Sequence, residues 1–272
     1  MMVSTVYAGG AWFAVEGAGY RKSGAITSVA GTGVPDFTRL ALGLVLDSDA
    51  TVGDDGAVVG DPTEAALVVL AAKLGVDAEE TRRSYPRLAE VPFDSEYKFM
   101  ATFHRFTADG VERVIELVKG APDVVLARCC HVGGPLSGSQ APIEEAGADI
   151  QAANERMGRK GLRVLAFAAR LIPADEVATV TTDPMSLTHD LSFVGMAGII
   201  DPLRAEAKGA VRTALGAGID VRMITGAIRR SRSPTDEPFS SGWCTPWSSS
   251  WPRCYPWSRD RTSRARSGRA PR

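Results

Sequence analysis

Residues 114–126 read Val-Ile-Glu-Leu-Val-Lys-Gly-Ala-Pro-Asp-Val-Val-Leu, and they decide how the middle of the chain folds. The apolar residues up to Val118 predict a strand, and Pro122 ends strand pairing and begins a helix that continues to Cys129. Lys119 and Gly120 therefore stand at the strand end. There an ammonium lies beside backbone that carries no side chain, so a phosphate or an adenine edge can approach closely. The stretch indicates a nucleotide pocket.

The segment upstream supplies a partner strand and an aromatic ring. Residues 91–101 read Val-Pro-Phe-Asp-Ser-Glu-Tyr-Lys-Phe-Met-Ala, and residues 90–119 predict a strand, a turn at Ala108-Asp109-Gly110, and a second strand. Phe93, on the earlier strand, offers a face on which a base can stack.

The rest of the first 190 residues predicts short strands, helices and one further strand. Residues 3–29 alternate apolar and polar positions, which favours two or three short strands. Helical spacing runs from Pro35 to Asp47 and again from Pro62, where Glu64 lies in the favourable first turn. A polar helix is expected from Ile143 to Lys160, and a strand follows over residues 162–171.

The segment after residue 190 has a different pattern. Leu191–Ile200 and Ile219–Thr225 are apolar almost throughout, and a helix is expected over residues 205–214 between them. Two such strands around a helix are typical of a parallel βαβ unit. The fold class expected is α/β, with an α+β domain over residues 30–190, whose antiparallel sheet is flanked by helices, and a partial parallel domain over residues 191–226. Residues 1–29 supply edge and entry strands.

Composition separates a tail from this core. The 272 residues carry a formal net charge of −1, but residues 227–272 hold ten Arg, no Lys and three acidic residues, and they contain no Leu, Val or Met. Such a segment lacks the aliphatic content for a core, so disorder is expected. Two interpretations compete: an Arg-rich and Trp-rich nucleic-acid binder, or an out-of-frame translation of GC-rich DNA. The absence of Lys favours the second.

Two further classes of function receive little support. No apolar run reaches the roughly 18–20 residues needed to cross a bilayer, and a reduced, cytoplasmic setting is expected because the four cysteines follow no secretory signal. Cys129-Cys130-His131 is a possible metal cluster, but adjacent cysteines seldom face one ion, so a plain structural segment is the favoured interpretation.

Six short motifs stand in the order found in P-type ATPases, and over residues 3–226 the chain resembles their cation-transporting, calcium-pump-like branch. The motifs are Gly60-Asp-Pro-Thr-Glu-Ala-Ala-Leu67, Phe93-Asp-Ser-Glu-Tyr-Lys98, Lys119-Gly-Ala-Pro122, Arg163-Val-Leu165, Asp201-Pro-Leu-Arg204 and Met223-Ile-Thr-Gly226. The resemblance implies a nucleotide-binding domain over residues 30–190, and part of a phosphorylation domain of the haloacid-dehalogenase type over residues 191–226 and at the edge formed by residues 1–29.

The resemblance also implies roles for individual residues. Phe93 would stack on adenine, Glu64 would accept from the adenine amino group or orient the pocket, and Lys98, Lys119 and Gly120 would line it. Arg163 would reach the phosphates with its planar fork. The hinge over the triphosphate would hold Asp201 and Arg204, and the phosphorylation domain would contribute Thr225 and Gly226. Each has a plainer structural interpretation: Phe93 as core, Lys98 as a solvated strand residue, Glu64 as a helix-start residue, and Asp201 with Arg204 as a helix-start pair.

The cofactors implied are ATP and Mg²⁺ as the ATP complex, the partners are ATP and the membrane and actuator domains of a parent pump, and no nucleic acid is expected. The parent reaction passes through an aspartyl phosphate, and its Asp-Lys-Thr-Gly-Thr motif does not occur in the 272 residues. Ala227 also stands where an aspartate is expected after Gly226. We therefore expect ATP binding without turnover by this chain alone. A standalone ATP-binding regulatory module is the alternative.

Overall fold

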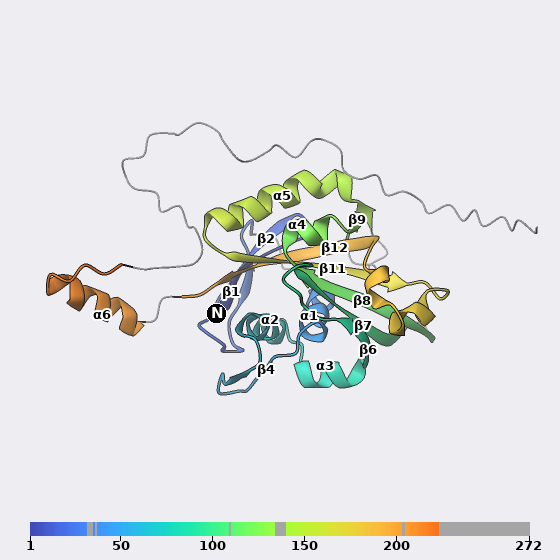
Figure 1. Cartoon of the computed structure of the whole chain (residues 1–272), viewed down its shortest axis with the longest axis horizontal. Helices are drawn as coiled ribbons and strands as arrows, with labels where there is room; N and C mark the ends of the chain where they lie inside the picture. The colour runs from blue at the N-terminus through green and yellow to red at the C-terminus, as the bar shows by residue number, and fades with distance from the viewer. Residues whose placement is uncertain (32–34, 36, 109, 134–139, 203–204, 223–272) are drawn as a thin grey trace, which may run out of the picture.

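A computed structural model describes residues 1–31, 35, 37–108, 110–133, 140–202 and 205–222. Within them the expected α/β class is confirmed: a large, mainly antiparallel sheet carries helices on both faces (Figure 1). The Arg-rich tail lies outside the described residues.

The main sheet has the strand order β3-β2-β1-β12-β11-β8-β7-β6, and every neighbouring pair along this path is antiparallel. Strand β9 pairs in parallel with β12 and antiparallel with β10. A separate small sheet pairs β4 with β5. The bounds are β1 Met2–Ala8, β2 Ala11–Val15, β3 Ile26–Ser28, β4 Thr51–Val52, β5 Val58–Val59, β6 Arg87–Val91, β7 Phe99–Ala108, β8 Val111–Gly120, β9 Cys129–Val132, β10 Ala141–Pro142, β11 Arg163–Ile172 and β12 Leu191–Ile200.

The hairpin of β7 and β8 confirms the turn and the two strands expected around it. The expected first strand from residue 90 is wrong in its N-terminal part, because β7 begins at Phe99, so Phe93 lies in the connection from β6 and not on a strand. Its register pairs Phe99 with Gly120 and Met100 with Lys119, so the end of β8 lies beside the start of β7. Gly110 takes a positive φ of 74° at the turn, a backbone conformation that glycine adopts without steric cost.

The helices divide between the two faces of the sheet. Figure 1 shows α5 on one side of the strands and α1, α2 and α3 on the other, with α6 apart from both. The bounds are α1 Thr38–Leu46, α2 Pro62–Lys73, α3 Ala78–Ser84, α4 Pro122–Leu126, α5 Ile143–Arg159 and α6 Ala205–Gly216, with short 3₁₀ helices η1 Val177–Thr181 and η2 Pro184–Leu187. One apolar core joins the sheet to α4 and α5, and a second joins it to α1 and α2.

Helix α2 begins as the sequence predicts. The Asp61 carboxylate accepts hydrogen bonds from the backbone N–H groups of Thr63 at 2.7 Å and Glu64 at 3.1 Å, which satisfies two amides of the first turn. Pro62 occupies the first turn, where its missing N–H costs nothing. This cap fixes the direction in which Glu64 leaves the helix.

Two expectations about local structure are wrong. Strand β12 does not build a parallel βαβ unit, because it pairs antiparallel with both β1 and β11 inside the main sheet, and Ile219–Arg222 form no strand. Helices cover both faces of this sheet, so an interior antiparallel strand is as apolar as a parallel one. The helix after Pro122 ends at Leu126, and Cys129 begins β9. The division into domains stays a prediction.

Candidate nucleotide site

Four segments that carry predicted site residues meet at one end of the sheet. The end of β8 supplies Lys119 and Gly120, and the N-terminus of α2 supplies Glu64. The connection from β6 to β7 supplies Phe93 and Lys98, and β11 begins at Arg163, three residues before the Ala166 that pairs with Gly120. The fold thus brings together residues that lie up to about one hundred positions apart in the sequence.

The Lys119 ammonium is buried and fully engaged. Only 7% of this residue is exposed, and its Nζ lies 3.1 Å from Glu64 Oε1 and 3.6 Å from Asp47 Oδ1. The same ammonium donates to the Asp47 carbonyl oxygen and lies 3.0 Å from Met100 Sδ. We define Lys119, Asp47 and Glu64 as the Lys119 cluster. A buried cation needs such partners, and this cluster supplies two carboxyl groups and a carbonyl.

Glu64 connects the cluster to the loop that follows α1. Its Oε2 accepts hydrogen bonds from the backbone N–H groups of Asp49 at 2.8 Å and Ala50 at 3.2 Å, while Oε1 faces Lys119. The plain interpretation, a residue that only favours the helix N-terminus, is therefore incomplete. Glu64 ties α2, β8 and the loop together.

Two arginines hold the carbonyl groups of the same loop. Arg87 donates to the Leu46 carbonyl at 3.0 Å, and Arg82 donates to those of Ser48 and Ala50 at 2.8 Å each. Neither arginine, nor Asp47, was among the residues that the sequence singled out. Their signal is weak, because single charged residues on a short helix and an edge strand read as ordinary surface positions.

Asp47 carries the most perturbed group of the cluster. It is only 2% exposed, Thr102 donates to its Oδ1 at 3.4 Å, and its Oδ2 has no hydrogen-bond partner within the part of the chain that the structure describes. Burial raises the pKa of the Asp47 carboxyl to about 8, although Lys119 and Arg87 act in the opposite direction. Desolvation thus outweighs the neighbouring positive charges.

Gly120 is required by the close approach of the neighbouring strand. A β-carbon at this position would lie 2.6 Å from the Lys98 carbonyl oxygen and 2.6 Å from Phe99 Cβ. The backbone N–H of Ala121 also donates to that carbonyl at 2.9 Å. Lys98 itself has a φ of 58°, in the left-handed region. The connection before β7 is therefore pressed against the end of β8, with no side chain between them.

Phe93 presents a free aromatic ring. It is 62% exposed although it is a large apolar residue, so its interpretation as a core residue is wrong. Tyr97 of the same connection is 44% exposed and lies 6.3 Å from the Phe99 ring, measured between ring centroids. An exposed ring held on a folded connection fits a surface that receives a flat apolar ligand.

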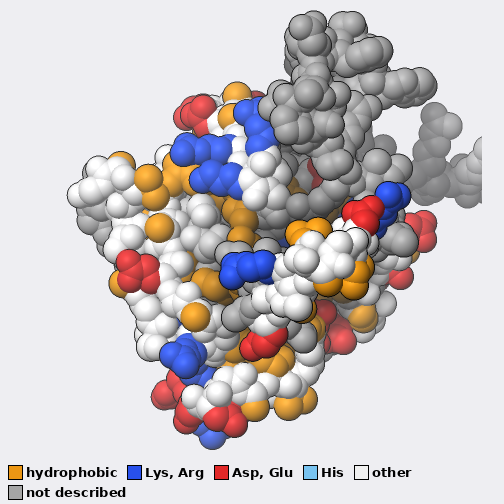
Figure 2. All heavy atoms as spheres, turned by 90° about the vertical axis from the view of Figure 1, so that its left-hand side faces the viewer, with side chains coloured by type: hydrophobic (Ala, Val, Ile, Leu, Met, Phe, Trp, Pro, Cys, Tyr) orange, Lys and Arg blue, Asp and Glu red, His pale blue; other side chains and the backbone are white. Residues whose placement is uncertain are grey.

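Two further predicted residues, Arg163 and Asp201, lie near the first turn of α2 and the N-terminus of the chain. Arg163 Nη1 donates to Thr63 Oγ1 at 3.0 Å, which places its guanidinium beside the first turn of α2. Asp201 is exposed, and its Oδ1 lies 3.7 Å from the Met1 amino group. Both residues line a wide, open hollow. Figure 2 looks onto this end of the molecule and shows Lys and Arg side chains gathered in the upper part of the view. Arg204, Thr225 and Gly226 lie outside the described residues.

Among the described residues, no group of three or more His, Cys, Asp or Glu side chains could hold a metal ion, and Cys129 is buried in the core. No described helix is long and apolar enough to span a membrane.

Comparison with known proteins identifies a family and several relatives. The family model of the P-type ATPase cytoplasmic domain N matches residues 37–206. The chain is 39% identical over 242 residues to "Cation-transporting ATPase pma1" of Synechocystis sp., covering 83% of this chain and 25% of that protein. It is 37% identical over 183 residues to "Calcium-transporting ATPase lmo0841" of Listeria monocytogenes, covering 67% and 20%.

A third relative is also similar. "Calcium-transporting ATPase type 2C member 1" of Pongo abelii is 34% identical over 218 residues, covering 78% of this chain and 21% of that protein. The chain thus spans a quarter or less of the length of these relatives. The family model covers more than half of the chain, and the match includes Glu64, Phe93, Lys119 and Arg163. The chain therefore belongs to the family of P-type ATPase cytoplasmic domains N.

Proposed function

We propose that the chain binds ATP at the end of β8. The observation that carries the proposal is the connection before β7, which exposes the ring of Phe93 and ends at Lys98, whose carbonyl lies against the strand end at Gly120, next to the buried Lys119. Adenine stacks on the exposed ring of Phe93.

The charged residues divide into two roles. Lys98 and Arg163 lie at the surface and attract the phosphates, Lys98 as a point charge and Arg163 as a fork that can hold two oxygens. Lys119 acts from below, because its ammonium is already engaged by Asp47 and Glu64. It sets the position of the floor of the pocket and contributes a positive field there.

The finer assignments rest on the motifs and on the names of the relatives. We propose that ATP arrives with Mg²⁺ on its phosphates, and that Asp201, Arg204, Thr225 and Gly226 face the triphosphate from the hinge side. We also propose that the parent enzyme is a calcium-pump-like cation transporter in which this region faces the cytoplasm and works with membrane, actuator and phosphorylation domains. The 272 residues contain no Asp-Lys-Thr-Gly-Thr motif, so the chain alone is expected to bind ATP without turning it over.

Isothermal titration of ATP into the full chain tests the proposal. The wild type should bind with a Kd in the high-micromolar to millimolar range, and Phe93→Ala should weaken binding about fivefold, because stacking contributes on the order of 1 kcal/mol. Val111→Ala, at a residue that is 53% exposed beside the distant β7–β8 turn, is the matched control and should bind as the wild type does. A folded wild type that gives no heat with ATP, or equal weakening by both variants, would overturn the proposal.

A further inference from the structure

Arg82 belongs to α3, a helix from which no residue has been assigned to the nucleotide. Its Nη2 donates to the backbone carbonyl oxygens of Ser48 and Ala50, both at 2.8 Å, and its Nη1 lies 3.4 Å from Glu79 of the same helix. Ser48 and Ala50 are fully buried, and 23% of the Arg82 side chain is exposed. A guanidinium that is mostly withdrawn from water and holds two buried carbonyls fixes the segment that carries them.

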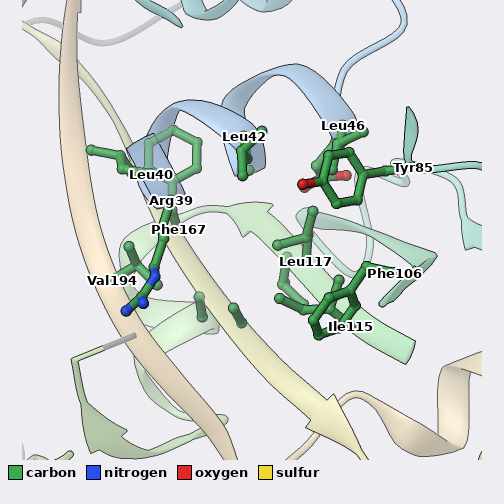
Figure 3. A pocket seen from close by; sticks show the side chains of 15 residues that line it. Arg39, Leu40, Leu42, Leu46, Tyr85, Phe106, Ile115, Leu117, Phe167 and Val194 are labelled. Carbon is green, nitrogen blue, oxygen red and sulfur yellow. The ribbon is translucent and has the colours of Figure 1, made fainter. Parts of the chain in front are cut away.

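Helix α3 reaches this segment because its end packs beside the end of α1. Tyr85, the residue that follows α3, packs against the apolar cluster that includes Leu46. Figure 3 shows the Tyr85 ring next to Leu46 at the end of α1, where both residues line an apolar pocket beneath that helix. This apolar contact holds α3 where Arg82 can reach the loop that follows α1.

The peptide unit between Ser48 and Asp49 is held at both ends. Its C=O accepts from Arg82, and its N–H, which belongs to Asp49, donates to Glu64 Oε2 at 2.8 Å. The unit is trans, so these two groups point in opposite directions, with Arg82 and Glu64 on opposite sides of it. Linked hydrogen bonds polarise one another, and here a cation stands at one end and a carboxylate at the other, so each bond strengthens its neighbour.

Glu64 has capacity for one more donor. A carboxylate offers about four acceptor positions. Oε2 accepts from the N–H groups of Asp49 and Ala50, and Oε1 lies 3.1 Å from the Lys119 ammonium. One position therefore remains on Oε1, and 16% of the Glu64 side chain is exposed. That position can accept a single N–H donor from a ligand, such as the amino group of adenine.

We propose that Arg82 is a positioning residue for the nucleotide site and that it acts through Glu64. It fixes the peptide unit that donates to Oε2, and this fixes the direction in which the remaining position of Oε1 points. Arg82 thereby supports a preference for a base that carries an amino group, without touching the base. The inference rests on the proposed binding of ATP. A merely structural arginine would affect stability but would not change the preference between two nucleotides.

The experiment compares ATP with ITP, whose base carries a carbonyl oxygen where adenine has its amino group. Both are titrated calorimetrically into the full chain. The wild type should prefer ATP by up to about tenfold, the fold-change expected for one hydrogen bond in a partly buried site. Arg82→Met should reduce this preference to less than about twofold by weakening ATP rather than ITP. Arg83→Met, the same change at the exposed neighbouring arginine of α3, should keep the wild-type preference. A wild type that binds both nucleotides equally, or a folded Arg82→Met with the wild-type preference, overturns the inference.

Two further variants test whether Arg82 acts through Glu64. In a Glu64→Ala background, Arg82→Met should change the ATP affinity by less than about twofold, because both substitutions remove the same contact. Fully additive losses in the double variant would contradict the proposal. Arg82→Lys keeps the charge but loses the planar fork, so its preference should lie between those of Arg82→Met and the wild type. Circular dichroism checks each fold, and Arg82→Lys decides if Arg82→Met does not fold.

One readout needs no nucleotide. In the ¹⁵N-labelled full chain, the N–H signals of Asp49 and Ala50 should move upfield in Arg82→Met and stay in place in Arg83→Met, because their hydrogen bonds to Glu64 weaken only in the first variant. If the folded wild type binds neither ATP nor ITP, the proposed function fails, but these signals still decide the role of Arg82. Unchanged Asp49 and Ala50 signals in folded Arg82→Met would overturn it.

Discussion

The two faces of the main sheet treat buried charge differently, and strand β8 shows both treatments within four residues. Toward α1 and α2 it presents Lys119, which has carboxyl and carbonyl partners. Toward the core shared with α4 and α5, on the side of Val114 and Val118, it presents Glu116, which is fully buried and has no hydrogen-bond partner for either oxygen in the described residues. The paired lysine borders the proposed site, whereas Glu116 is a buried acid opposite Arg170, which is itself paired with Glu176.

A raised pKa occurs on both faces of the sheet and is therefore independent of where a carboxyl group lies. Burial raises the pKa of Glu116 and of Asp47 to about 8 in each case, although Asp47 has a lysine beside it and Glu116 has Thr188 and its cross-strand neighbour Arg170. A raised pKa alone therefore does not identify the functional face. The partners distinguish the two carboxyl groups, because the Lys119 cluster connects the end of α1, the start of α2 and the end of β8.

The largest expected effect comes from breaking the paired side. Lys119→Met leaves Asp47 and Glu64 without their cation and should lower the free energy of unfolding by about 3–5 kcal/mol, measured by urea denaturation. Lys98→Met, at an exposed lysine with no ion pair among the described residues, is the control and should stay within about 0.5 kcal/mol of the wild type. Equal small losses in both variants would show that the cluster contributes little.

Gly120→Ala should have the next largest effect. The new methyl group would stand 2.6 Å from the Lys98 carbonyl oxygen, so the backbone must shift at the strand end. We expect a loss of about 1–3 kcal/mol of stability and weaker ATP binding. Gly158→Ala in α5, where a β-carbon meets nothing within 4 Å, is the control for a tolerated methyl group. Wild-type stability in Gly120→Ala would show that the strand end is not tightly packed.

The unpaired side is tested by pH. Glu116 has a folded-state pKa above its unfolded value, so its contribution to stability is fully present below the unfolded pKa and is lost as pH rises through about 8. Between pH 6.5 and 8 the wild type should therefore lose stability, and Glu116→Gln should make that slope shallower by up to about 1.4 kcal/mol per pH unit. His104, whose pKa burial lowers to about 4, acts in the opposite direction only below this window. Urea midpoints at several pH values give the slope, and an unchanged slope in Glu116→Gln would contradict this account.

The smallest expected effect on stability comes from Gly43→Ala in α1, the helix that packs on the Lys119 face of the sheet. Gly43 lies inside this helix, and its added β-carbon would make an ordinary contact with Leu117 Cδ2 at 3.8 Å. Gly43→Ala should raise the free energy of unfolding by about 0.5–1 kcal/mol, because alanine has the higher helix propensity. A lower thermal midpoint in this variant would show that the space beneath α1 is smaller than the structure indicates.

Part of this structure could be read from the sequence. Pro62 with Asp61, the β7–β8 hairpin, and helix α5 followed by β11 were predictable because caps, turns and periodicity act over a few residues. The position of Lys119 at a strand end followed in the same way. The meeting of Lys119 with Glu64 came from the family resemblance.

The rest depends on contacts between distant segments. Arg82 and Arg87 find their partners at the end of α1 and in the loop after it, and Asp47 finds its partners on β7 and β8; tertiary packing sets these contacts, which no local pattern encodes. The pairing of β12 was mistaken because apolar composition reports burial on both faces and not strand direction. The proposed hinge residues Arg204, Thr225 and Gly226 stay predictions from their motifs.

The most direct test of the account is to map ATP onto the chain by amide chemical shifts. The ¹⁵N-labelled full chain is titrated with ATP, and the assigned backbone N–H signals are followed. The account predicts that the largest shifts occur at Phe93, Lys98, Gly120 and Arg163, with smaller shifts at Asp49 and Ala50, whose N–H groups donate to Glu64. Shifts confined to other parts of the chain, or none from a well-folded sample, would contradict the assignment of a nucleotide site to the end of β8.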